Sequence, residues 1–466
     1  MTPAAKFLTH RLGAPDPRIR TEAARSIARA IMDGDSAVKA AFLVWIASRD
    51  LESETASCLA IMLAFDLGAA FTPEEVDDAN RAPSILSEVL MGQVFPEQHL
   101  PRRRLEYAPL DAEPDRDLVA YFDSKDGQFI PPIFTTNLRR LGLGGKMLLD
   151  RWRTEWCWLQ AQRREPFSDR PDVLWGQGPR SNHVDFQARQ SEMFLSAYLR
   201  ALAFGAEQWG LPVNKAKDLA LDGLALNAGL SVVEPLARPS WTVGVSSALM
   251  EGDKAVCAQA LWAAAAASAP EGHVVISLNT VDHNDLGYSD ITILRTLHRD
   301  GVLPAAGPCE LEISPSGILL QGVPGGLVGA PDPFTPLGEE PTMALSGYLR
   351  PTHYGRLEMG FFPHGIQLAH PDLFATGAVT ADRDGIHFVD QGDRLSTWRY
   401  WNADWQPTRD RHVRRLGGFV TTVDETRLKA YLAEQGGQAG LYCQIAQASR
   451  SAIYEDLTRQ VERIWL

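Results

Sequence analysis

The densest group of potential metal ligands in this chain lies between residues 282 and 290. It combines carboxylates with one imidazole, and the candidate ligands are Asp282, His283, Asp285 and Asp290. Carboxylates and imidazoles bind divalent cations, and ligands in open α/β sheets gather beyond the carboxyl ends of strands, such as the apolar strand predicted at 274–278. A metal-dependent hydrolase would use such a site. The alternative, which the sequence favours, is a polar loop whose Asp and Asn side chains make turn hydrogen bonds.

A second candidate is a recognition surface in which aromatic residues precede a run of arginines. Tryptophan can stack on bases or sugars, and arginine can pair with phosphates or carboxylates. Such a surface would suit a protein that binds nucleic acid or nucleotides. Alternatively, the tryptophans fill the core of a sheet and the arginines pair with nearby acids. The residues of this candidate surface are Trp398, Trp401, Trp405, Arg409, Arg411, Arg414 and Arg415.

Other chemical motifs in the chain are incomplete. The glycine-rich stretch 142–147 lacks the serine or threonine that follows the lysine of a phosphate loop, because Met147 stands there. Cys257 opens an alanine-rich helix without identifiable catalytic histidine motifs nearby, so we interpret it as a structural thiol. No cofactor can be named from these patterns. The histidines of the C-terminal region are scattered near Asp372, Asp382 and Asp384; they are His353, His364, His370 and His387.

Length and composition limit the class of protein. The chain has 466 residues, of which 45% are hydrophobic, and a formal net charge of −13 at pH 7. About three domains are expected at this length. The negative charge disfavours non-specific nucleic-acid binding, although a local basic patch can still bind. The bias toward arginine over lysine, with many alanines and glycines, is typical of a GC-rich bacterial genome.

The location of the protein is predicted from its cysteines and its apolar runs. The five cysteines are widely spaced and include no C-x-x-C pair, which favours free thiols in a reducing cytosol. The N-terminus lacks the apolar region of a signal peptide. No uninterrupted apolar run reaches the ~18 residues that cross a bilayer. We therefore expect a cytoplasmic protein without a membrane partner.

Short amphipathic helices are predicted at the amino end. Apolar residues recur at four-residue intervals from Ile19 through Ala23 and Ile27 to Ile31, which builds one stripe. Asp16 followed by Pro17 is typical of a helix start. The run from Asp16 to Ala28 resembles the second half of a HEAT-type α-solenoid unit, and the resemblance extends over residues 3–69. It implies stacked helix pairs that bind another macromolecule.

The middle of the chain predicts mixed elements. A strand and hairpin are expected over 118–130, and helices over 145–164, 185–209, 213–228 and 253–268. The tryptophans at helical spacing in 145–164 are interpreted as core residues. Strands at 241–245 and 273–278 flank the alanine-rich helix, and residues 291–298 are helical or strand-like. A βαβ crossover is expected from this order.

The last third of the chain predicts strands and closing helices. Turns at Asp382–Gly385 and Asp390–Asp393 separate apolar runs between 377 and 400, which is typical of an antiparallel meander. Helices are expected over 424–435 and 446–465.

Together these patterns predict an α+β protein. Its expected parts are a helical HEAT-like domain at 1–95, a linker at 96–118, a mixed α/β domain at 119–300 and a β-rich domain with C-terminal helices at 301–466. The preferred function is a non-catalytic interaction subunit of a larger bacterial assembly, with a protein partner. The metal-dependent hydrolase and the nucleic-acid binder remain the alternatives.

Overall fold

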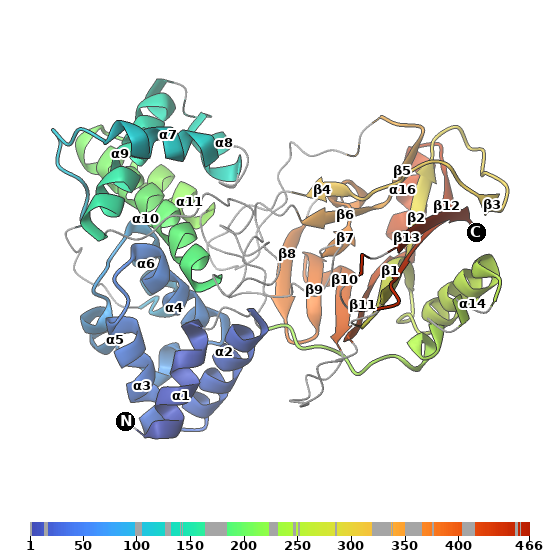
Figure 1. Ribbon diagram of the computed structural model, residues 1–466, viewed down its shortest axis with the longest axis horizontal. Helices are drawn as coiled ribbons and strands as arrows, with labels where there is room; N and C mark the ends of the chain where they lie inside the picture. Colours follow the sequence, from blue (N-terminus) through green and yellow to red (C-terminus); the bar gives the residue numbers. More distant parts are fainter. Residues whose placement is uncertain are drawn as a thin grey trace. The chain divides into compact units, whose positions relative to one another are not determined.

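The computed structural model contains two compact units (Figure 1). Unit 1 holds the described residues up to Val232, and unit 2 holds those from Val233 onward. This boundary coincides with none of the boundaries expected from the sequence. The residues that the structure describes are 2–13, 17–97, 105–125, 132–139, 141, 143–163, 184–222, 232–245, 248–249, 252–284, 287–318, 337, 339–349, 366–374, 377–402, 415–452, 455–456 and 458–466.

Unit 1 is helical. Helix α1 contacts α3 and α3 contacts α5, whereas α4 contacts α6 and α10 (Figure 1). Helix α10 also packs along α9 and α11. The helices are α1 (Pro3–His10), α2 (Pro17–Met32), α3 (Ser36–Ala47), α4 (Glu52–Ala64), α5 (Pro73–Ala79), α6 (Ile85–Val94), α7 (Arg116–Lys125), α8 (Pro132–Arg139), α9 (Leu143–Arg163), α10 (Val184–Gln208) and α11 (Val213–Asp222), with short 3₁₀ turns η1 (Arg11–Gly13) and η2 (Gly68–Ala70).

Side-chain caps determine where several of these helices begin. The Asp35 carboxylate accepts hydrogen bonds from the first amides of α3, and Thr72 with Glu75 forms a reciprocal capping box at α5. Asp115 caps α7 through the amides of Asp117 and Leu118. The hairpin expected over 118–130 is therefore wrong at its first strand, because a run of five apolar residues fits a capped helix equally well.

Aromatic side chains of α7, α9 and α10 form the core of unit 1. Trp152 and Trp156 are fully buried, and Phe122 packs edge-on against both rings. The Trp156 ring stacks on Phe194 with 4.9 Å between centroids. The indole N–H of Trp152 donates to the Phe194 carbonyl oxygen at 2.9 Å, so this buried polar group keeps a partner. The interpretation of these tryptophans as core residues is confirmed.

A buried ion pair joins α4 to α10. The Arg200 guanidinium lies 2.5 Å from the Glu52 carboxylate, and the side chains are 4% and 3% exposed. Burial raises the pKa of Glu52, and the Arg200 charge opposes that rise. The hydroxyl of Ser196 donates to that of Ser53 at 3.0 Å beside the pair. These contacts join α4 to α10 within an apolar core, and loss of either charge would leave the other buried without its partner.

Unit 2 is built on a large antiparallel sheet with the strand order β3-β13-β12-β2-β1-β11-β10-β9-β8, and β5 pairs with β2. A smaller sheet has the order β4-β6-β7. The strands are β1 (His273–Asn284), β2 (Gly287–His298), β3 (Gly307–Pro308), β4 (Ser316–Ile318), β5 (Thr342–Ala344), β6 (Ser346–Leu349), β7 (Gln367–Ala369), β8 (Ala378–Asp382), β9 (Gly385–Asp390), β10 (Asp393–Asn402), β11 (Arg415–Asp424), β12 (Gln438–Ser449) and β13 (Thr458–Trp465); the helices are α14 (Lys254–Ala267) and α16 (Glu425–Glu434), with 3₁₀ turns η4 (Ser240–Thr242) and η5 (Pro371–Leu373).

The large sheet buries both faces around β1 and β2. Leu261 and Trp262 of α14 pack on one face against Ile293 of β2. The opposite face carries Leu294, which packs with Tyr442 of β12. Strand β7 also contacts β1, β10 and β11. Polar side chains on buried strands therefore need partners within the protein.

The α+β fold class is confirmed. Helices α9, α10, α11, α14 and α16 lie where helices were expected, and β8, β9 and β10 form the expected antiparallel meander.

Three other predictions of secondary structure are wrong. The strand expected at 241–245 includes the 3₁₀ turn η4, and β1 pairs with β2 as an antiparallel hairpin, so the βαβ crossover does not form. The helix expected over 446–465 is instead the end of β12 and all of β13. Most of β13 is exposed, and only Ile464 and Trp465 at its end are buried, on opposite faces of the sheet. The apolar residues Val461, Ile464 and Trp465 stand at i, i+3 and i+4, a spacing that also fits a helix. Among the described helices, none is both long enough and apolar enough to span a bilayer.

The Glu52–Arg200 pair generates a prediction about the stability of unit 1. Arg200→Met should reduce the unfolding free energy by about 3–5 kcal/mol, because it leaves Glu52 buried without its cation. Urea-dependent hydrogen exchange of peptides from α4 and α10 measures the loss. Arg153→Met in α9 is the matched control: its ion pairs with Asp123 and Asp150 are exposed, so its cost should be below about 1 kcal/mol. Equal losses in the two variants would contradict the prediction.

Candidate functional site

The segment proposed as a metal site is mostly a hairpin, not a loop. Asp282 and His283 belong to β1, Asp290 belongs to β2, and Asp285 lies outside the described residues. Asp282 pairs with Ser289, whereas Asp290 pairs with Val281. Because paired residues share a face and neighbours alternate, Asp282 and Asp290 point to opposite faces of the sheet. Across the described residues, no three His, Cys, Asp or Glu side chains gather in a way that could hold a metal ion.

Asp290 has a structural partner instead. Its carboxylate accepts a 2.7 Å hydrogen bond from the side-chain amide of Asn279, and both residues are buried. The same amide donates to the Thr292 hydroxyl at 3.0 Å. The network satisfies polar groups on the face of the sheet opposite to α14.

The predicted recognition surface is divided by the structure. Trp398 and Trp401 of β10 are 0% and 1% exposed, so these two rings belong to the core rather than to a surface. Trp398 lies 5.4 Å from the Tyr400 ring, and Trp401 meets Trp241 edge-on at 5.3 Å. Arg415 is the first residue of β11. The remaining members lie outside the described residues: Trp405, Arg409, Arg411 and Arg414.

Two histidines singled out by the sequence are buried beside aspartates. His370 lies next to Asp372, with 3.7 Å between its Nδ1 and the carboxylate, and burial lowers the pKa of His370 to about 4. His387 of β9 has a carboxylate on one ring nitrogen and a hydroxyl on the other. Its Nε2 lies 2.9 Å from Asp382 Oδ1, and its Nδ1 lies 3.0 Å from Thr397 Oγ1 of β10. His353 and His364 lie outside the described residues.

The electrostatics of the second cluster keep its histidine neutral. Burial lowers the pKa of His387, and the Asp382 carboxylate offsets only part of this. Burial raises the pKa of Asp382, but hydrogen bonds from His387 and from the Asp384 amide reverse this, so that its pKa is below the ordinary value. Arg394 also approaches Asp382 at 2.5 Å. Asp382 is therefore ionised near neutral pH, while His387 is an unprotonated imidazole.

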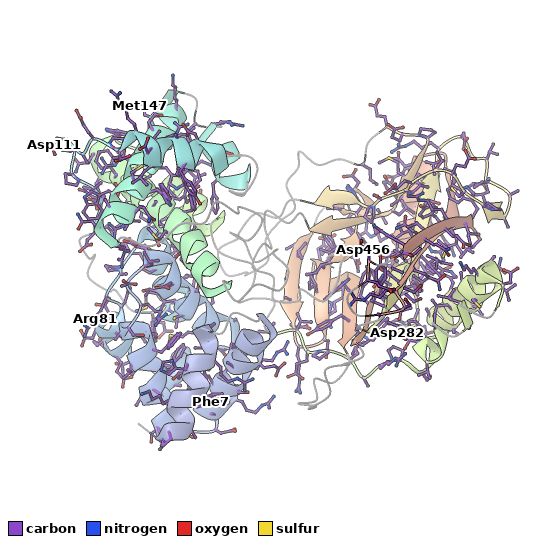
Figure 2. The ribbon with its side chains drawn as sticks, viewed as in Figure 1. Phe7, Arg81, Asp111, Met147, Asp282 and Asp456 are labelled. Atoms are coloured by element: carbon purple, nitrogen blue, oxygen red, sulfur yellow. The ribbon has the colours of Figure 1, made fainter. Side chains whose placement is uncertain are left out.

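An exposed surface on the first helices is the site that best suits a macromolecular partner. We call it the α1–α3 surface. Phe7 and Val44 leave 67% and 57% of their surface exposed (Phe7 is labelled in Figure 2). Trp45 is half-buried: the His10 ring packs edge-on against it at 5.7 Å, and the Arg49 guanidinium lies 3.9 Å above it. The surface consists of Phe7, His10, Arg11, Val44, Trp45 and Arg49.

Local packing holds the α1–α3 surface together. A Cβ on Gly13 would lie 3.0 Å from the Trp45 ring, so the chain leaves α1 in close contact with that ring. The Arg11 guanidinium lies 5.8 Å from the centroid of the Phe7 ring. Aromatic residues and arginine are the types that dominate binding energy at protein interfaces. Arg11 and Arg49 add positive charge to this surface, and the Arg49 guanidinium also lies 3.9 Å from the Glu54 carboxylate.

The sequence alone did not reveal Thr397 as a partner of His387. Next to the turn at Asp390–Asp393, Asp393 pairs with Asp390 and Arg394 pairs with Val389. If this pairing continued along β9 and β10, His387 would face Ser396. A bulge between Arg394 and Ser396 shifts the register by one residue, so that His387 faces Thr397. The His10–Trp45 contact likewise depends on how α1 packs on α3.

Neither the scan against protein-family models nor the search of the curated proteins finds a match to this chain.

The Asn279–Asp290 contact gives a test of the metal hypothesis. Asp290→Ala should lower the unfolding free energy of unit 2 by about 1–3 kcal/mol, because it leaves the buried Asn279 amide without its strongest acceptor. The loss should be the same with and without EDTA, as measured by hydrogen exchange of peptides from β1 and β2. A wild-type protein destabilised by EDTA to the level of the variant would restore the metal hypothesis.

Proposed function

We propose that unit 1 is a non-catalytic protein-docking module, and that through it the chain acts as an interaction subunit of a larger bacterial assembly. The observation that carries this proposal is the α1–α3 surface, where exposed apolar side chains adjoin a tryptophan and two arginines. Single exposed apolar side chains are ordinary on protein surfaces, whereas contiguous apolar patches mark interaction sites. Their grouping with tryptophan and arginine is typical of interface hot spots.

The contacts between helices support a solenoid-like arrangement. Helices α1, α3 and α5 contact one another in succession, while α4 contacts α6. In an α-solenoid, alternate helices form two layers in this way, and the outer layer remains available to a partner. The HEAT-like resemblance of residues 3–69 is part of this proposal, and α2 also contacts α1 and α3. The chemistry of the surface suits a partner segment with apolar residues flanked by acidic ones.

The alternatives have less support. The metal-dependent hydrolase needs Asp282 and Asp290 on one face of the sheet, and the nucleic-acid binder needs Trp398 and Trp401 exposed. A cytoplasmic location is also part of the proposal. It rests on the cysteines, which are all unpaired thiols in the structure.

Affinity purification tests the docking proposal. The tagged full-length chain is purified from its source cells as wild type and as the double variant Phe7→Asp/Val44→Asp. Both side chains are exposed, so the double variant should keep wild-type thermal stability within a few degrees. The amount of a stoichiometric protein partner recovered with the double variant should be at least 10-fold lower than with wild type, because two charges are placed in an apolar contact.

The matched control is Met147→Asp in α9. Met147 is 49% exposed and lies at the opposite end of unit 1 from Phe7 (Figure 2). This control should recover the partner as well as wild type does. Equal recovery by the double variant, or the absence of any stoichiometric partner of the wild type, would refute the proposal.

A further inference from the structure

We propose that Asp382, His387 and Thr397 form a nucleophilic site that transfers acyl groups from esters, with the Thr397 hydroxyl as nucleophile. This activity is independent of the docking function proposed for unit 1. It rests on a chain of two hydrogen bonds across β8, β9 and β10, in which the Thr397 hydroxyl contacts the His387 imidazole and the Asp382 carboxylate orients that imidazole.

The position of each proton follows from the partners. An ionised Asp382 can only accept, so Nε2 of His387 carries the proton and donates it to Oδ1 across 2.9 Å. Nδ1 then has a free lone pair, and the Thr397 hydroxyl donates to it across 3.0 Å. This tautomer is the one in which a histidine can remove a proton from a hydroxyl. Asp382 acts as a positioning residue, since it holds the imidazole without meeting a substrate.

Strand geometry fixes the pair. His387 and Thr397 are directly opposite each other in the β9–β10 ladder, so their side chains share a face of the sheet. The two side chains are 1% and 9% exposed, whereas Asp382 retains 41%. A hydroxyl and an imidazole held in this way lose little freedom when a substrate arrives at the edge of the site.

Arg399 supplies a cation on the face of the sheet that carries Thr397. It is two residues after Thr397 on β10, so its side chain lies on the same face. Its Nε is buried and has no hydrogen-bond partner among the described residues. A Cβ on Gly385 would lie 3.3 Å from Arg399 Cγ, 3.4 Å from Thr397 Cγ2 and only 2.3 Å from the Trp398 carbonyl oxygen. Glycine at this position therefore lets β9 approach β10 closely and leaves Thr397 and Arg399 next to each other.

These groups account for both halves of an ester hydrolysis. The Thr397 oxygen bonds to the acyl carbon, its proton passes to His387 Nδ1, and Arg399 faces the negative charge that develops on the carbonyl oxygen. The bond to the leaving alkoxide then breaks, and His387 returns the proton to that alkoxide. In the second half, water attacks the acyl-threonine and His387 takes a proton from the water. The bond between the acyl carbon and the Thr397 oxygen then breaks, His387 passes its proton to that oxygen, and the carboxylic acid leaves.

Hydrolysis of p-nitrophenyl acetate by the full chain tests the proposal. Wild type should release p-nitrophenol faster than buffer, and tandem mass spectrometry of the quenched reaction should locate an acetyl group on Thr397. Thr397→Val keeps the shape of the side chain and removes the hydroxyl, so its rate should fall about 100-fold or more. The rate of the His387→Gln variant should fall by a similar factor. Thr397→Ser should retain activity, which separates loss of the nucleophile from loss of the fold.

The control and the pH profile distinguish catalysis from a structural network. Thr380→Val alters an exposed threonine opposite His387 on β8 and should leave the rate unchanged. The wild-type rate should fall on acidification with a midpoint below pH 6.5, where His387 becomes protonated, and Asp382→Asn should reduce the rate and change that profile. A wild-type rate equal to buffer, acetylation at another residue, or full activity in Thr397→Val would overturn the proposal.

Discussion

The register of the antiparallel sheet in unit 2 is the constraint on which its chemistry depends. Each residue of a strand shares a face with the residue opposite it, and a shift of one position moves every side chain to the other face. The register of β1 and β2 separates Asp282 from Asp290. A single bulge in β10 brings Thr397, rather than Ser396, opposite His387. Whether polar residues can act together is thus decided by pairing rather than by closeness in the chain.

Two-sided burial explains why polar residues of the sheet form networks. The central strands are covered by α14 on one face, whereas the other face carries the buried side chains of Leu294, Tyr442 and Trp465 and contacts β7. A buried amide or carboxylate without a partner costs free energy, so Asn279 and Asp290 are bonded to each other. His298 is held in the same way between the hydroxyls of Thr296 and Thr342. Residues that look like ligands in the sequence can therefore be structural.

Unit 1 meets a different constraint. Its helices bury an aromatic core between α7, α9 and α10, and the buried Glu52–Arg200 pair joins α4 to α10. Helices packed in this way still have outer faces, and those of α1 and α3 carry Phe7 and Val44 toward solvent. An apolar side chain that the core does not need, beside a tryptophan and an arginine, is suited to a contact with another chain. The docking proposal for unit 1 and the catalytic proposal for unit 2 thus rest on separate physical grounds.

Local physics in the sequence was sufficient for the α+β class, for most of the long helices and for the meander of β8 to β10. Helical periodicity, caps such as Asp253 before α14 and turns such as Asp382–Gly385 act over a few residues, so their effect can be predicted without the fold. Where the few apolar residues stood at helical spacing, as in β13, or in a short run, as in α7, the pattern fitted a helix and a strand equally. Tertiary structure alone decided those elements, the faces of Asp282 and Asp290, and the meeting of His387 with Thr397. These depend on register and packing between segments, which the order of residues within one segment does not specify.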